Sequence, residues 1–174
     1  MEIIEQSAVF VKTKLKEHVS IKSSLLNSIR NTGIHSIVEV TQQISNSDWY
    51  LPQNFRRGYD NMFMPLVDSY SKELQDVLKF PFRLGCSGYW FQQYAQGDFH
   101  NWHTHECTYA SVYYLDLPEG SSKTSFKLID KEFEIDIEEG DILTFPGSTL
   151  HCSKPNKSDK VKTVIAFNLS PISR

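Results

Sequence analysis

Three histidines have the type and spacing that a metal ion requires. His103 and His105 are two residues apart, and His151 lies far downstream. Residues two apart in a β-strand project to the same face, so the first two imidazoles can reach one ion while His151 approaches from another strand. Neutral imidazole binds iron, zinc, copper and nickel, and a site with three protein ligands leaves positions open for small molecules. The pattern predicts a non-haem metalloenzyme.

Two neighbouring side chains are alternatives to this ligand set. Glu106 is adjacent to His105 but has the opposite strand parity, so we favour His105 over Glu106 as the second ligand. His100 differs in parity from His103, and we interpret it as a rim or exposed residue rather than a ligand.

The cysteines do not form a recognisable framework. Their number is odd, and the spacing of Cys86, Cys107 and Cys152 matches no known zinc or disulfide pattern. Cys107 has the same parity as His105, whereas Cys152 follows His151 directly, and we interpret both as packing residues. No secretory signal is evident at the start of the sequence, so we expect reduced thiols and a cytoplasmic protein.

The composition indicates one soluble globular domain over residues 1–174, with 40% hydrophobic and 22% charged residues. The net charge of −3 suggests no nucleic-acid partner. No segment approaches the roughly 18 apolar residues that span a bilayer, so we expect no membrane partner. A homodimer remains open, because the N-terminal elements could cap a barrel or form a dimer face.

The N-terminal part, residues 1–81, is predicted to contain one strand and two helices. Residues 7–15 alternate as a strand does, and 18–30 carry apolar residues at helical spacing. A second helix is predicted over about 61–78, with a later start as an alternative because Pro65 is tolerable only in the first turn.

The helices are separated by a polar and aromatic segment, residues 45–59. One interpretation is a surface loop that Trp49 and Tyr50 pin to the core. The alternative is a lid or a substrate-contacting loop.

The remainder, residues 82–171, has the pattern of a β domain. Several short strands are separated by regular turns, and Asp130-Lys131 is predicted to close a hairpin. This order predicts an α+β protein with a mainly β core, a jelly roll with the N-terminal helices packed on it. The predicted strands are 88–94, 109–115, 125–129, 132–137, 142–145 and 161–169.

The histidine segments resemble the two cupin motifs. Gly97, five residues and His103-x-His105 are similar to the first motif. Gly140, five residues, Pro146 and then His151 are similar to the second. The sequence departs from both, because the glutamate expected after His105 falls at Tyr109 or Ala110 and the glycine of the second motif is Ser148.

A stronger resemblance is to the iron(II)- and 2-oxoglutarate-dependent oxygenases, and within them to a group of small oxygenases of bacteria and phages. It covers residues 82–171 well and the N-terminal part in outline. The landmarks, in order, are Tyr94-x-x-Gly97 before the histidine pair, Ser111-Val-Tyr-Tyr-Leu115, Leu143-Thr-Phe-Pro-Gly-Ser-Thr-Leu-His151, Pro155-Asn156 and Lys162-Thr-Val-Ile-Ala-Phe-Asn168. The resemblance implies a double-stranded β-helix.

The resemblance also implies the roles of the site residues. His103 is the first iron ligand and His151 the distal one, while His105 stands where the wider superfamily has an acidic ligand. Three neutral imidazoles leave the whole metal charge to be balanced by the oxoacid. The small-oxygenase group shows His-Thr-His at this place, so the substitution agrees with it.

The co-substrate needs a cation for its far carboxylate, and the resemblance places Lys162 there, with Lys160 as the alternative. A lysine is a point charge rather than a bidentate fork, so it needs a helper, for which Tyr114 is the candidate. Tyr94 is a further candidate for the co-substrate pocket. Asn168 is a candidate partner of the oxoacid or of a metal ligand.

These observations lead to three functional hypotheses. The first is an Fe(II)- and 2-oxoglutarate-dependent dioxygenase that hydroxylates a small-molecule or peptidyl substrate and releases succinate and CO2. The second is a three-histidine cupin-type metalloenzyme, such as a thiol dioxygenase, that uses no 2-oxoglutarate. The third is a jelly-roll binding module without catalysis.

Overall fold

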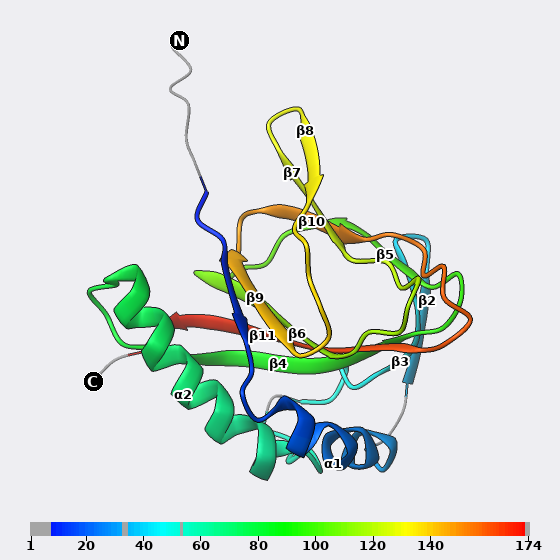
Figure 1. The fold of residues 1–174 in the computed structure, drawn as a ribbon, viewed down its shortest axis with the longest axis horizontal. Coiled ribbons are helices and arrows are strands. Elements are labelled where there is room, and N and C mark those ends of the chain that lie inside the picture. Colours follow the sequence, from blue (N-terminus) through cyan, green and yellow to red (C-terminus); the bar gives the residue numbers. More distant parts are fainter. Residues whose placement is uncertain (1–7, 33–34, 53, 173–174) are drawn as a thin grey trace.

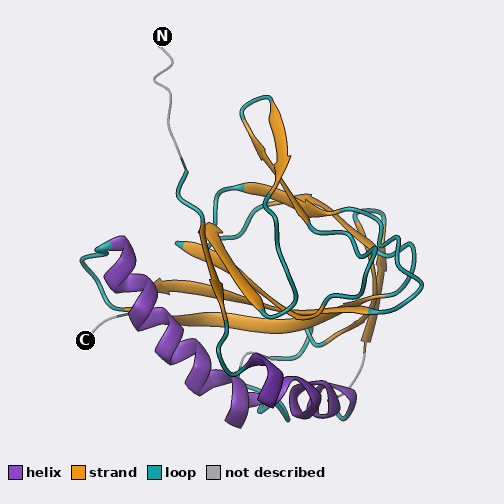
Figure 2. Ribbon diagram, viewed as in Figure 1, coloured by secondary structure: helices purple, strands orange, loops and turns teal. Residues whose placement is uncertain are grey.

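The computed structural model, which describes residues 8–32, 35–52 and 54–172, is mainly β with two helices (Figures 1 and 2). The helices are α1 (His18–Arg30) and α2 (Asp60–Leu78). The strands are β1 (Val11–Lys14), β2 (His35–Glu39), β3 (Gln42–Ser47), β4 (Leu84–Tyr94), β5 (Phe99–His103), β6 (Tyr109–Asp116), β7 (Thr124–Leu128), β8 (Lys131–Glu134), β9 (Asp141–Pro146), β10 (Leu150–Ser153) and β11 (Lys162–Pro171).

The strands form one antiparallel sheet that curls back over itself. Its order is β1-β9-β6-β11-β4-β3-β5-β10-β7-β8, with β2 added to β3. In Figure 1 the layer of β4, β6 and β11 lies opposite the layer of β5, β7 and β10. This is the predicted double-stranded β-helix, and it brings β5 and β10, which carry two of the histidines, side by side.

Both helices cover the outer face of the β4–β6–β11 layer (Figure 2), and this layer separates two apolar cores. The outer core packs helix residues such as Phe63 and Val67 against Phe167 of β11, and the rings of Phe63 and Phe167 meet edge to face at 5.8 Å. The inner core fills the curl around Phe126 and Phe145. Each such side chain contributes about 1.5–3 kcal/mol by leaving water.

The second helix begins earlier than Pro65 would suggest. It starts at Asp60, which places Pro65 in the second turn rather than the first. Proline cannot donate the backbone hydrogen bond of that turn. The helix continues through it because the apolar stripe on its inner face, which includes Phe63, Val67 and Leu74, is buried against the sheet.

Most predicted strands are present with shifted ends. The N-terminal strand is shorter than 7–15, and Ser7 lies outside the described residues. The hairpin is confirmed as β7–β8, but its turn lies at residues 129–130, with Ile129 at φ 55°, and β8 ends at Glu134. Strands β2 and β3 were not predicted, because the one buried apolar side chain in each, Ile37 and Ile44, gives no period-2 signal.

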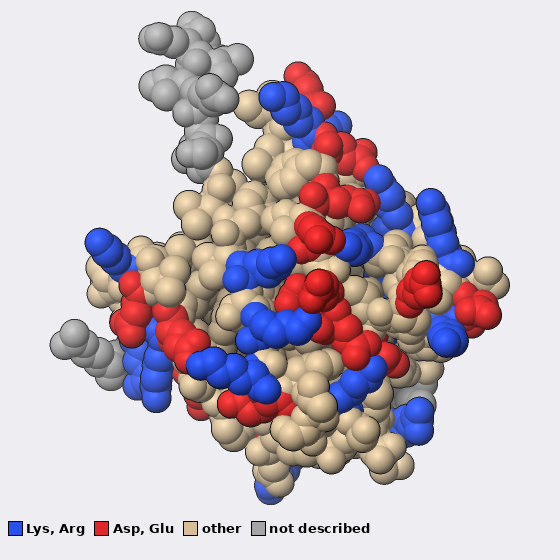
Figure 3. Space-filling view, viewed as in Figure 1, with Lys and Arg blue, Asp and Glu red and all other residues tan. Residues whose placement is uncertain are grey.

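The charge distribution on the surface and the polarity of the two helices agree with the small net charge and the lack of a long apolar segment in the sequence. Basic and acidic side chains are interspersed on the face seen in Figure 3. Among the described residues, neither helix has the length and apolar character to cross a membrane.

Candidate metal centre

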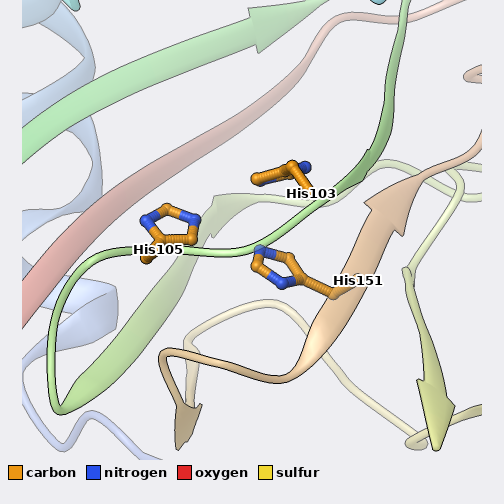
Figure 4. A group of neighbouring side chains, drawn as sticks. All are labelled: His103, His105 and His151. Atoms are coloured by element: carbon orange, nitrogen blue, oxygen red, sulfur yellow. The ribbon is translucent and has the colours of Figure 1, made fainter. Parts of the chain in front are cut away.

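The rings of His103, His105 and His151 converge on one point (Figure 4). One nitrogen of each lies within 4.8 Å of the corresponding nitrogen of the other two. His103 ends β5, and the β5–β10 register sets it directly opposite His151, with ring centroids 4.2 Å apart. Metal–imidazole bonds of about 2.0–2.1 Å would bridge such a group after a small closing movement. The donor set therefore fits a metal ion of the kind that prefers imidazole.

His105 reaches this point by a different route from the one that strand parity predicted. Strand β5 ends at His103, so His105 lies beyond it, in an extended segment. Its backbone N–H donates to the carbonyl oxygen of Gly147 at 2.8 Å, and the N–H of Gly147 donates to the carbonyl oxygen of Thr108 at 3.0 Å. A Cβ at residue 147 would overlap the backbone of Cys107, so only glycine permits this approach.

Backbone carbonyls fix the orientation of two of the rings. Nδ1 of His103 lies 2.7 Å from the carbonyl oxygen of Asn101, and Nδ1 of His151 lies 2.8 Å from that of Thr149. A carbonyl only accepts, so Nδ1 must carry the proton in both histidines. Nε2 is then the free donor for a metal, and the carbonyl contact makes it more basic.

Burial keeps these imidazoles neutral. It is the main cause that lowers the pKa of His151 to about 3 and that of His105 to about 4, with a further contribution from the neighbouring His103. Burial also lowers the pKa of His103, although the Asn101 carbonyl opposes this. No proton has to leave these rings near neutral pH before a cation binds.

The alternative ligands do not join the group among the described residues. Glu106 is exposed and stands at the cavity wall, and neither Cys107 nor Cys152 belongs to the cluster. His100 is nearer than predicted. Its ring stacks on that of His103 at 3.8 Å, and burial lowers its pKa to about 3.

The histidines open onto a cavity of about 450 Å³ inside the curled sheet. Volumes of this order hold small ligands and co-substrates. All four predicted co-substrate residues line the cavity, and so do two tryptophans: Tyr94, Tyr114, Lys162, Asn168, Trp49 and Trp90.

Lys162 is the buried cation of this cavity. Its residue surface is 2% exposed, and no carboxylate among the described residues forms an ion pair with it. Its Nζ donates to Ser153 Oγ at 2.7 Å and to the carbonyl oxygen of Ser122 at 3.1 Å, and it lies 4.3 Å from the centre of the Tyr94 ring. Burial lowers the pKa of Lys162 to about 7. Such a group is stabilised when an anion enters.

The other predicted residues have distinct positions. The hydroxyl of Tyr114 lies 2.6 Å from Thr124 Oγ1, and the hydroxyl of Tyr94 donates to Gln92 Oε1 at 3.0 Å. Lys160, the alternative anchor, is exposed and is not part of the cavity wall.

The 45–59 segment contacts the cavity, but it is anchored differently from the prediction. Trp49 and Tyr50 are 44% and 57% exposed and do not pin it to the core. The anchor is the buried carboxylate of Asp48, which accepts hydrogen bonds from the Arg57 side chain at 2.6 Å and from the backbone N–H of Phe91 at 2.8 Å. The same carboxylate accepts one from the Tyr59 hydroxyl at 2.6 Å.

This anchor places an aromatic wall beside the histidines. Trp49 meets Trp90 edge to face at 4.3 Å, and Trp90 stacks on His105 at 5.7 Å. A cue to the wall was the position of Trp49 in a loop rich in aromatic residues.

No protein-family model and no curated protein matches the sequence. Solved structures do match over nearly the whole chain. A prolyl-4-hydroxylase of Pseudomonas putida aligns with a TM-score of 0.69 and 13% identity, covering 95% of this chain and 94% of the other. A 2OG-Fe(II) oxygenase family oxidoreductase of Burkholderia pseudomallei gives 0.76 and 9%, covering 92% and 85%. The viral collagen prolyl hydroxylase of Paramecium Bursaria Chlorella virus-1, in its 2OG complex, gives 0.60 and 15%, covering 94% and 96%.

The chain therefore has the jelly-roll fold of the 2OG-Fe(II) oxygenases. At these identities the likeness concerns the fold, and function has to be argued from the site.

Proposed function

We propose that the protein is an Fe(II)- and 2-oxoglutarate-dependent dioxygenase. One observation carries the proposal: three neutral imidazoles share a single cavity with a buried lysine that pairs with no carboxylate of the described residues. The first suits a divalent cation, and the second suits a carboxylate. A metal-chelating dicarboxylic acid satisfies both.

The spacing between the two ends supports a short dicarboxylate. Lys162 bonds to Ser153, which is two residues from His151 on the same strand, β10. Two residues along a strand span about 6.6 Å, which is comparable to the length of a five-carbon oxodiacid. His103, His105 and His151 would hold the metal, and Lys162 with Tyr114 would hold the far carboxylate.

The bound iron and oxoacid would supply the dioxygen chemistry, in which 2-oxoglutarate becomes succinate and CO2 while a C–H bond of the substrate becomes C–OH. The protein would hold the imidazoles in one tautomer, place the co-substrate and exclude water from the curled sheet. Trp49, Trp90 and Glu106 line the part of the cavity near His105 that is left for the substrate. The substrate is either a small molecule or a peptidyl group. The peptidyl class is included because two structural neighbours are named prolyl hydroxylases.

The cupin-type alternative and the binding-module alternative leave Lys162 unexplained. A buried lysine whose pKa falls to about 7 destabilises the empty fold, and neither alternative by itself requires an anion that would offset this. The oxygenase hypothesis does.

An anaerobic titration of the iron(II)-loaded protein with 2-oxoglutarate tests the proposal. We expect a visible metal-to-ligand charge-transfer band to appear on saturation. The Lys162→Ala variant should need a higher oxoacid concentration to form it, whereas the matched variant of the exposed lysine, Lys160→Ala, should behave as the wild type does.

The other outcomes identify the competing hypotheses. Iron binding without a band at saturating oxoacid would favour the cupin-type enzyme. A protein that takes up no metal in its intact fold would support the binding module.

A further inference from the structure

The three histidines differ in what holds the ring nitrogen that faces away from the metal point. His103 and His151 each donate to the carbonyl oxygen two residues earlier in the chain, at 2.7 and 2.8 Å. His105 lies beyond the end of β5. Unlike the other two histidines, it makes no ring-nitrogen hydrogen bond to a described residue that meets the usual distance and angle limits. One ligand of the proposed metal site thus lacks the contact that fixes the tautomer of the other two.

Asn168 has a side-chain oxygen that lacks a hydrogen-bond donor within the described part of the chain. Its Oδ1 is shielded from solvent and has no hydrogen-bond donor among the described residues. Water cannot satisfy an acceptor that it cannot reach, and buried acceptors are seldom left unpaired. A donor for it has to come from the groups around it, and among the described residues the Nε1–H of Trp90 and the His105 ring both lack a partner there.

The strand register brings this acceptor to His105. Ala166 of β11 pairs with Trp90 of β4, and Asn168 lies two residues further along β11 on the same cavity-lining face. The Trp90 ring stacks on His105, with the two planes 12° apart. Trp90 therefore covers one face of His105, and the Asn168 side chain lies within hydrogen-bonding reach of the same ring.

We propose that Asn168 is a positioning residue whose Oδ1 accepts the N–H of His105, so that the other ring nitrogen is presented to the metal. It would serve His105 as the backbone carbonyls serve His103 and His151. The inference rests on the proposed metal site.

The choice of a carboxamide has a chemical consequence. A carboxylate acceptor would make His105 a stronger donor and return a negative charge to a site that has three neutral ligands, whereas an amide fixes the ring and adds no charge. Asn168→Asp should therefore keep the orientation of His105 and strengthen metal binding, while Asn168→Leu should lose the orientation.

The test uses two readouts. Zinc affinity is measured by competition with a chromophoric chelator, without oxoacid. The ring tautomers are read in the metal-free protein from long-range nitrogen–proton NMR correlations, with the His105 signals identified by their loss in His105→Gln. Ser170→Ala, also on β11 but outside the cavity wall, is the matched control, and melting temperatures show that each variant is folded.

We expect a single tautomer at His105 in the wild type, Ser170→Ala and Asn168→Asp, and a mixture in Asn168→Leu. Zinc affinity should fall about 10- to 100-fold in Asn168→Leu and should equal or exceed the wild-type value in Asn168→Asp. A folded Asn168→Leu with unchanged tautomer and affinity would overturn the inference, as would an Asn168→Asp that matches the Leu variant. If the wild type binds no metal, the proposed function fails, and the tautomers of the metal-free protein still decide the part played by Asn168.

Discussion

At one end of the cavity three histidines, of which one is buried and two are half-buried, stay neutral, while at the other end a buried lysine remains partly charged. Burial lowers the pKa of His105 to about 4 and of His151 to about 3, so these rings avoid a charge by releasing a proton. Burial also lowers the pKa of Lys162, but only to about 7, so about half of these side chains are protonated at neutral pH. The histidine end is ready for a cation without an electrostatic penalty, and the lysine end carries its penalty until an anion arrives.

This difference between the two ends indicates that the fold loses stability for the sake of ligand binding at the lysine end and not at the histidine end. The histidine end relies on backbone carbonyls and on glycine, which require no buried charge. The lysine end offers two hydroxyl or carbonyl acceptors and an aromatic face in place of a carboxylate. An internal carboxylate partner would stabilise the empty fold, but it would also compete with the co-substrate.

The largest predicted effect is that of Lys162→Met, which should weaken 2-oxoglutarate binding while making the ligand-free protein more stable. Without its cation the site should lose about 10- to 100-fold in 2-oxoglutarate affinity, because a charge-assisted contact contributes about 1.5–3 kcal/mol. Metal affinity should be unchanged. At pH 7 the melting temperature without ligand should rise by roughly 3–6 °C, as expected for a gain of about 1–2 kcal/mol in a chain of this size.

The sign of the stability effect follows from the pKa shift. The folded-state pKa of Lys162, about 7, lies below the ordinary value of a lysine, 10.5, so the unfolded chain binds more protons between these values. The destabilisation is complete below pH 7 and disappears as the pH approaches 10.5. The gain in Lys162→Met should therefore shrink toward high pH in a series of thermal melts, and a variant less stable than the wild type at pH 7 would contradict this.

The affinity for 2-oxoglutarate should depend on pH through the same lysine. The oxoacid needs the charged form, so its dissociation constant should rise above about pH 7, approaching tenfold per pH unit. The imidazoles of His105 and His151 are neutral throughout this range and add no slope. Titrations of the zinc-loaded protein between about pH 6.5 and 8.5 would measure the slope. Lys162→Met is the control and should show none, and an equal slope in both proteins would place the titrating group elsewhere.

The two ends also differ in how far the sequence alone could predict them. Lys162 was placed by the resemblance to the 2-oxoglutarate-dependent oxygenases, and the structure puts Lys162, but not the alternative Lys160, in the cavity wall. The pairing of β5 with β10 agrees with the expectation that His151 approaches from another strand.

Contacts between distant segments could not be predicted in this way. Strand parity put His105 on β5, but its place depends on a backbone bond to Gly147, far away in the sequence. The anchor of the 45–59 segment was missed for the same reason, since Asp48 looks like a surface aspartate until Arg57 and the backbone of Phe91 surround it. Pairings of this kind depend on the tertiary fold rather than on local pattern.

The smallest predicted effect tests the histidine end, where backbone geometry stands in place of charge. Gly147→Ala would set a Cβ against the backbone of Cys107 and push away the segment that carries His105, while His103 and His151 keep their carbonyl contacts. We expect metal affinity to fall about tenfold by chelator competition, as for other losses of ligand positioning. Because Lys162 lies at the far end, its pH-dependent contribution to the dissociation constant of the oxoacid should be retained.

Gly97→Ala is a matched control, since nothing lies within 4 Å of a Cβ there and its positive φ of 86° costs stability without touching the site. Equal metal affinity in both variants would show that the Gly147 contact does not set the position of His105.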